Sequence, residues 1–342
     1  MPSRQVEIAA PRDAARVYWV GHSLMNSVDQ SVAGAESVMQ LVGTLADARS
    51  QSYASYDHTL WGSALFFNWQ GSSHGEARDD TKPRADRAYL GEHGGEYDAF
   101  VFTEVVPIGE ALGWAYSKYY LRKFYCEALE HNPNAEVFLY QTWNNAQPES
   151  PDALDFGARV RSDRKYWEEL ADESLSARVA NPGRLGRWLA RVGIREEHCS
   201  PSKAFRFISA GSAMLALSVE LSTLGNQAPR LANGNPVTMA DLFANAYTNW
   251  DEVQRGEAST LTLRRPDAKH DDIHPSALGA YFVGLVAYAT IYGTDPAGLP
   301  ALNGVSEDVA ALLQRVAWQT VISDPRSGVA ATRRTDSASS ER

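Results

Sequence analysis

Apolar residues along this chain gather in short runs that alternate with longer stretches of helical periodicity. The short runs are rich in β-branched and aromatic residues, as in Val-Tyr-Trp-Val at residues 17–20, and this composition favours a strand. The run at residues 51–58 is the least apolar, so its strand has the weakest signal. The sequence predicts five strands, at residues 17–21, 51–58, 97–104, 136–140 and 204–208.

Helical patterns separate these runs. Apolar residues recur on one face of the first helix, and a proline ends the second because it disfavours a helical conformation in the residue before it. The predicted helices cover residues 31–49, 112–131 and 276–292, with another that ends near residue 224. Strands that alternate with helices form a parallel sheet covered on both faces. The predicted fold class is therefore α/β, a three-layer α/β/α sandwich with a flavodoxin-like parallel sheet of about five strands.

The length of 342 residues suits one large α/β domain with insertions. We expect residues 16–322 to form this domain, with insertions at about 150–203 and 244–270. Residues 1–15 are polar and expected to be flexible. The Ser-rich residues 323–342 are expected to form a disordered tail.

Arginines recur at helical spacing in the first predicted insertion, at Arg184, Arg187, Arg191 and Arg195. The other side of this stretch is apolar, so we interpret the arginines as the solvated face of an amphipathic helix. The alternative is a cap that binds an anionic polymer or a partner.

The net charge bears on possible binding partners, and the cysteine content bears on disulfides. The formal net charge of −10 argues against nucleic acid as the main partner, whereas it does not oppose a neutral ester or sugar. Two cysteines, Cys126 and Cys199, provide no disulfide framework, and Cys126 is expected to be a small core residue. Nothing in the sequence indicates an oligomeric state.

The chain as written carries no membrane or export signal. No run of residues is long and apolar enough to span a membrane, and the N-terminus lacks the apolar core of a signal peptide. We therefore expect a cytoplasmic protein, or a secreted or periplasmic one if an upstream leader is missing.

A candidate nucleophile, Ser23, lies just after the first predicted strand, which ends at Gly21. Ligands of open α/β sheets bind outside the carboxyl ends of the strands, so the hydroxyl of Ser23 is expected in that crevice. Backbone N–H groups near a helix start could face a developing oxyanion there. The alternative is a serine that only caps a helix.

A candidate base, His274, precedes the last predicted helix. A serine nucleophile needs a base, and the base needs an orienting carboxylate. Asp271 lies three residues before His274, so one turn can place both side chains on the same side. Asp271, rather than Asp272, is predicted to hold one imidazole nitrogen while the other faces Ser23.

The N-terminal Gly-x-Ser and the C-terminal Asp-x-x-His together resemble the SGNH, or GDSL-type, hydrolase family. His22 stands where the family name has Asp, and the resemblance spans most of residues 15–300. It implies the SGNH hydrolase fold and a serine esterase in which Ser23 attacks the ester. His274 would transfer the proton and Asp271 would orient it, with no metal and no cofactor.

Two further blocks of the family match less well. The second block is a glycine whose N–H helps to form the oxyanion hole, and Gly71 is its best match, followed by Gly75. A plain turn glycine is the alternative. The third block normally supplies an asparagine donor, and Glu104 stands in its place.

The carboxylate of Glu104 poses a chemical question, because an ionised carboxylate cannot donate to an oxyanion. Glu104 could be protonated, could bind a substrate hydroxyl, or could be replaced as a donor by Asn144 or Asn145. We expect it to line the pocket in its ionised form, with Gly71 and the Ser23 N–H as the main donors. An ordinary loop carboxylate paired with an Arg or Lys is the alternative.

The aromatic loops favour a small acyl group on a carbohydrate or small alcohol, with acetyl as the leading candidate. Trp143, after the fourth strand, could stack on a sugar ring, or it could be an ordinary rim aromatic. Acyl transfer to a sugar hydroxyl and a catalytically silent carbohydrate-binding relative are alternative functions. Metal-dependent hydrolysis is another, with a single ion held by His22, His270, Asp271, Asp272 and His274.

Overall fold

The computed structural model of the chain describes most of the sequence, and it describes residues 82–85 by their backbone alone. The described residues are 6–29, 32–70, 82–144, 156–176, 199–243, 273–302 and 304–330. The predicted arginine-rich helix lies outside them.

Parallel strands form a single sheet in the order β2-β1-β3-β4-β5. They are β1 (Ala14–Gly21), β2 (Ser52–Thr59), β3 (Ala99–Phe102), β4 (Glu136–Tyr140) and β5 (Arg206–Ile208). This is the flavodoxin-like order, and it confirms the predicted α/β fold class. The chain passes to opposite sides of β1 to form β2 and β3, so a ligand crevice is expected where β1 and β3 end.

The side chains of each central strand alternate between two apolar cores. In β1, Val17 and Trp19 enter the core on one face of the sheet, whereas Tyr18 and Val20 enter the core on the other. A strand buried on both faces therefore needs a continuous apolar run, which is why β1 was predictable. The edge strand β2 keeps most of its residues partly exposed, which explains its weak signal.

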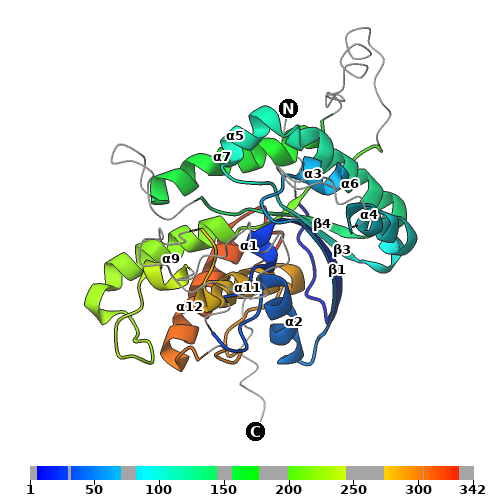
Figure 1. Cartoon of the computed structure of the whole chain (residues 1–342). Helices are drawn as coiled ribbons and strands as arrows, with labels where there is room; N and C mark the ends of the chain where they lie inside the picture. The colour runs from blue at the N-terminus through cyan, green and yellow to red at the C-terminus, as the bar shows by residue number, and fades with distance from the viewer. Residues whose placement is uncertain are drawn as a thin grey trace.

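Helices cover both faces of the sheet (Figure 1). One layer holds α3 (Leu65–Gln70), α4 (Lys82–His93), α5 (Ile108–Trp114), α6 (Ser117–His131) and α7 (Phe156–Ser174). The other holds α2 (Val38–Asp47), α9 (Ala210–Leu224), α11 (Ala277–Tyr292) and α12 (Glu307–Ser323). The short α1 (Ser23–Asn26) follows β1 at the front of Figure 1. The predicted three-layer sandwich is thus confirmed.

Two predicted helices differ from the observed ones. The first begins at Val38 rather than near residue 31, because Ser37 caps it and exchanges hydrogen bonds with Gln40. The second is divided into α5 and α6 by a corner at Tyr116, whose φ of +53° lies outside the helical region.

The predicted domain boundaries also need correction. Residues 150–203 were expected to be an insertion, but α7 buries Trp167 and Leu170 in the core and so belongs to a helical layer. The tail was expected to begin at 323, yet Asp324 pairs with Arg164 of α7. The end of the described chain also meets its beginning, because the Ala9 N–H donates to the Gly328 carbonyl over 2.9 Å.

Cys126 and Cys199 form a disulfide, contrary to the expectation that Cys126 is a plain core residue. Cys126 lies on α6, and Cys199 lies in the segment that leads to β5, 73 residues later. Arg122, one turn earlier on α6, donates to the Cys199 carbonyl over 3.0 Å. The two segments run side by side, a proximity that sequence spacing does not reveal. No helix of the described residues is long and apolar enough to cross a membrane.

Candidate active site

The turn after β1 presents Ser23 at the start of α1. A side chain at Gly21 would place Cβ 2.4 Å from a methyl carbon of Thr103, so only glycine permits the close approach of β1 to the end of β3. His22 is buried, and its Nε2–H donates to the Glu104 carbonyl over 3.0 Å, while Nδ1 accepts from the Leu24 N–H at 3.4 Å. Burial lowers the pKa of His22 to about 4, so the neutral ring bridges the two strand ends.

The structure brings Ser23 and His274 together although 251 residues separate them in the sequence. His274 Nε2 lies 2.8 Å from Ser23 Oγ. Ser23 is only 7% exposed, so its hydroxyl lies in a largely desolvated position. This is the geometry that a nucleophile and its general base require.

The segment that carries His274 is held from both sides. Ser276 caps α11 by accepting from the Gly279 N–H at 3.2 Å, and its hydroxyl donates to the Asp241 carbonyl over 2.6 Å. Asp29, which follows α1, accepts from the Ala277 N–H at 3.1 Å. The start of α11, and with it His274, is therefore attached to the segment that carries Ser23.

Several predicted residues lie outside the described residues: Gly71, Gly75, Asn145, His270, Asp271 and Asp272. Their assignments stay predictions. Within the described part of the chain, no three residues of the types His, Cys, Asp and Glu gather closely enough to hold a metal ion.

Glu104 was predicted to line the pocket as an ionised group, but in the structure it lies inside the protein. Its side chain is fully buried, and Oε1 accepts from the Val105 N–H at 2.8 Å and from the Leu65 N–H at 3.1 Å. Burial raises the pKa of Glu104 to about 7, with the hydrogen bonds opposing that rise. The carboxyl group thus joins the loops after β2 and β3 from inside the protein.

Trp143 and Asn144 also have partners that the sequence did not suggest. Trp143 is 1% exposed, so it cannot stack on a sugar ring. Its indole N–H instead donates to the Ile273 carbonyl over 2.9 Å, immediately before His274. Asn144 donates to the carboxylate of Asp163 on α7. Trp143 is buried in the apolar core that contains α2, α9, α11 and α12, a position that no local pattern encodes.

The sequence marks the region after β2 as a long aromatic loop, but none of the residues that directly follow the strand was chosen as a site candidate. Trp61 in this loop stacks on His274, with ring centroids 6.0 Å apart and an interplanar angle of 27°. Gly62 follows with φ of +63°, and a Cβ there would meet no described atom within 4 Å. The predicted Gly71 comes one helix later, beyond α3. If the sequence had marked the end of β2 at Thr59 more clearly, Gly62 would have been the first glycine after that strand.

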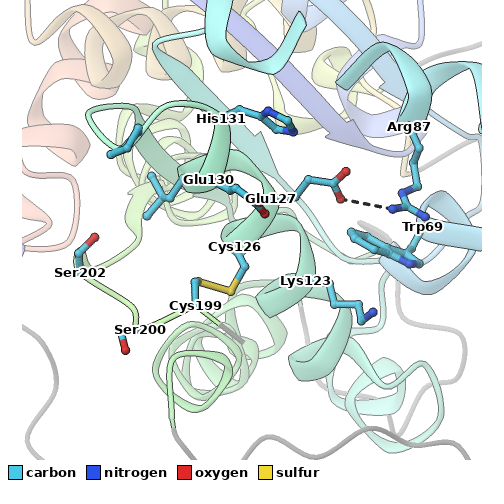
Figure 2. Close-up of a pocket in the computed structure, with 12 residues that line it drawn as sticks. Trp69, Arg87, Lys123, Cys126, Glu127, Glu130, His131, Cys199, Ser200 and Ser202 are labelled. Atoms are coloured by element: carbon cyan, nitrogen blue, oxygen red, sulfur yellow. Dashed lines mark ion pairs between the residues drawn. A yellow bond between two sulfur atoms is a disulfide. The ribbon is translucent and has the colours of Figure 1, made fainter. Parts of the chain in front are cut away.

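A separate pocket of about 730 Å³ opens beside α6, and neither Ser23 nor His274 lines it (Figure 2). Figure 2 shows the Cys126–Cys199 disulfide in its wall and Trp69 on its other side. Arg87 lies 3.9 Å from the centre of the Trp69 ring and pairs with Glu127 over 3.5 Å. Because Ser23 and His274 lie outside it, we do not assign the chemistry to this pocket.

Comparison with known proteins supports the fold. No protein-family model matches the chain, and no curated protein matches its sequence. Among solved structures, a DUF4886 family protein from Bacteroides uniformis superposes with a TM-score of 0.50 and 13% identity, over 91% of this chain and 95% of the other.

Two enzymes superpose less closely. Phospholipase A1 from Streptomyces albidoflavus has a TM-score of 0.35 and 10% identity, over 83% of this chain and 100% of the other. A carbohydrate esterase family 2 enzyme from Corynascus thermopiles has a TM-score of 0.36 and 14% identity, over 84% of this chain and 69% of the other. The strand order, and the placement of Ser23 and His274 at the carboxyl ends of the strands, agree with the SGNH, or GDSL-type, hydrolase-like fold that the sequence motifs implied.

Proposed function

We propose that this protein is a serine hydrolase that cleaves carboxylic esters, with Ser23 as the nucleophile and His274 as the general base. The observation that supports it most is the 2.8 Å contact between His274 Nε2 and Ser23 Oγ. Neutral His22 and buried Glu104 support the turn around Ser23 without competing for His274.

In the proposed reaction, Ser23 Oγ attacks the ester carbonyl carbon while His274 Nε2 takes the hydroxyl proton. The tetrahedral intermediate collapses, and His274 gives that proton to the departing alkoxide, which leaves as the alcohol. Water then attacks the acyl-Ser23 ester and gives a proton to His274. His274 returns it to Ser23 Oγ as the carboxylic acid is released.

Asp271 remains our candidate to orient His274 and to stabilise its charged form. For the oxyanion, the Ser23 N–H is a suitable donor because the first N–H groups of a helix have no acceptor within it. Gly71 is the second candidate, and Gly62 is a further one, since it adjoins the Trp61 that contacts His274. Glu104 instead supports these loops, because its carboxyl group is directed to the amides of Leu65 and Val105.

A short acyl group, such as acetyl, on a carbohydrate or small alcohol is the proposed substrate. The half-buried indole of Trp61 beside His274 supports it, because an aromatic face can pack against a sugar ring. Transfer of the acyl group to a sugar hydroxyl would use the same first step. Product analysis with an added sugar separates the two outcomes.

The test is turnover of p-nitrophenyl acetate by the wild type, Ser23→Ala and His274→Ala. Both variants should lose at least about 10³-fold in kcat. Ser27→Ala is the matched control, because Ser27 is buried four residues later and its hydroxyl has no hydrogen-bond partner among the described residues. Turnover by Ser23→Ala equal to that of Ser27→Ala would exclude the serine mechanism.

A further inference from the structure

A tryptophan outside the predicted site contacts the proposed base. The ring of Trp61 lies parallel to the imidazole of His274 within 27°, with centroids 6.0 Å apart. This separation and angle belong to the offset-stacked arrangement that aromatic pairs favour. Trp61 is half-buried and lies outside the apolar clusters formed by the described residues.

A dedicated acceptor holds the Trp61 indole. Its Nε1–H donates to Asn26 Oδ1 over 2.8 Å. The amide of Asn26 is itself fixed, because its Nδ2 donates to Asp57 Oδ2 over 3.1 Å. Asp57 lies on β2 and is held in turn by the Thr59 N–H, which donates to Oδ1 over 2.9 Å. The plane of the indole is thus set by the framework of the sheet.

Asn26 and Ser23 are the last and first residues of the same helix, α1. This helix therefore reaches His274 by two routes. One is the direct contact of Ser23 Oγ with His274 Nε2, and the other passes from Asn26 through Trp61 to the imidazole face. Because α1 contacts His274 both directly and through Trp61, the nucleophile and the base are held in one geometry.

We propose that Trp61 is a positioning residue for His274 and that Asn26 is its anchor, an inference that rests on the proposed function. The bond between Cβ and the imidazole has a broad torsional preference, so a contact on the face of the ring can limit its tilt. The stacked indole of Trp61 makes such a contact. It also presents an aromatic face to the imidazolium that forms when His274 takes the Ser23 proton, and such a face attracts a cation.

The experiment compares Trp61→Phe, Trp61→Leu, Asn26→Ala and the Trp61→Phe/Asn26→Ala pair, with Trp318→Phe as the control. Trp318 lies on α12 and packs against the core, so its replacement tests the general effect of removing an indole. The kcat and KM for p-nitrophenyl acetate are measured for each. The proton on Cε1 of His274 is followed by NMR in histidine-labelled protein and identified by its loss in His274→Ala.

Trp61→Phe and Asn26→Ala should each lower kcat about threefold to tenfold with the KM for p-nitrophenyl acetate changed less than twofold, because this substrate has no sugar ring to pack against the indole. The double variant should be no slower than the slower single one, because both break the same hydrogen bond. Trp61→Leu should lower kcat further and shift the Cε1 proton resonance, since it removes the aromatic ring from the imidazole face.

The outcomes distinguish this inference from the proposed function. If wild-type turnover depends on Ser23 but the Trp61 and Asn26 variants match Trp318→Phe in kcat, the positioning role is wrong and the function stands. The same holds if the effects of the two single changes simply multiply, or if Trp61→Leu leaves the His274 resonance in place. If Ser23→Ala keeps wild-type turnover, the proposed function fails, and the positioning role fails with it.

Discussion

Replacing Glu104 by glutamine removes a titratable proton from the loops that support the nucleophile. Glutamine has nearly the same shape, and its carbonyl oxygen can still accept from the amides of Leu65 and Val105. The carboxyl group of Glu104 is fully buried. The exchange therefore isolates the effect of ionising this one group.

The sign of the effect follows from proton binding. Burial raises the pKa of Glu104 from an ordinary 4.5 to about 7. Between these values the unfolded chain loses the proton while the folded chain keeps it, so the folded state binds more protons. The contribution of Glu104 to stability is fully present below pH 4.5 and is lost as pH rises to about 7. One pKa unit is worth about 1.4 kcal/mol, so the loss is about 3 kcal/mol.

The assay is urea unfolding of the wild type and Glu104→Gln between pH 4.5 and 8.5, followed by tryptophan fluorescence. The free energy of unfolding of Glu104→Gln, minus that of the wild type, should increase by about 3 kcal/mol up to neutral pH and stay level above it. Glu110→Gln, an exposed carboxylate in the first turn of α5, controls for the loss of a surface charge. A difference that stays constant with pH, or that narrows as pH rises, would refute the reasoning from burial.

Four further outcomes test the site and the fold. Asp271→Asn should lower kcat by about 10⁴ with little change in KM, whereas a larger loss in Asp272→Asn would transfer the orienting role to that residue. Ester turnover should survive EDTA, and its restoration by zinc or manganese after loss would contradict the serine mechanism. Cys126→Ser should cost about 4 kcal/mol of unfolding free energy, because the disulfide closes a loop of 73 residues; unchanged urea midpoints would argue that it does not form. Gly21→Ala should lower both stability and kcat, since the added methyl group meets Thr103, and wild-type values for both would mean that the end of β1 can move.

The disulfide bears on where the protein works. Disulfides persist in oxidising compartments and are rare in the cytoplasm. We therefore propose the secreted or periplasmic location that the sequence left as its second choice. The test is a thiol titration of protein isolated under native conditions. Unreactive Cys126 and Cys199 would support the secreted or periplasmic location, and two reactive thiols would contradict it.

Strand β1 and the positions of Ser23 and His274 could be predicted from short stretches of sequence. β1 was predictable because Tyr18 and Trp19 are buried on opposite faces, which requires a continuous apolar run. Ser23 and His274 could be predicted as partners because one follows a strand and the other precedes a helix, and parallel strands gather such ends at one edge. The order of the strands then brought them within 2.8 Å.

Features that depend on distant packing were not predictable. Trp143 was expected at the rim, but its burial depends on the Ile273 carbonyl, 130 residues later. The corner at Tyr116 interrupts a continuous helical pattern, and tyrosine gives no sign of its positive φ. Glu104 was predicted to line the pocket, and its burial could not be foreseen because it arises from three loops that come together only in the folded protein.

The position of His274 just before α11 makes the proposed ester turnover depend on the docking of this helix. α11 buries nearly its whole surface, and it packs beside α2 and α12, elements from opposite ends of the chain. A ribosome-bound chain that has emerged only as far as residue 272 contains all the described strands of the sheet but lacks His274, the proposed base. Turnover of a fluorogenic ester by nascent chains of increasing length would therefore begin only after α11 has docked, so the proposed activity would report the docking of this helix.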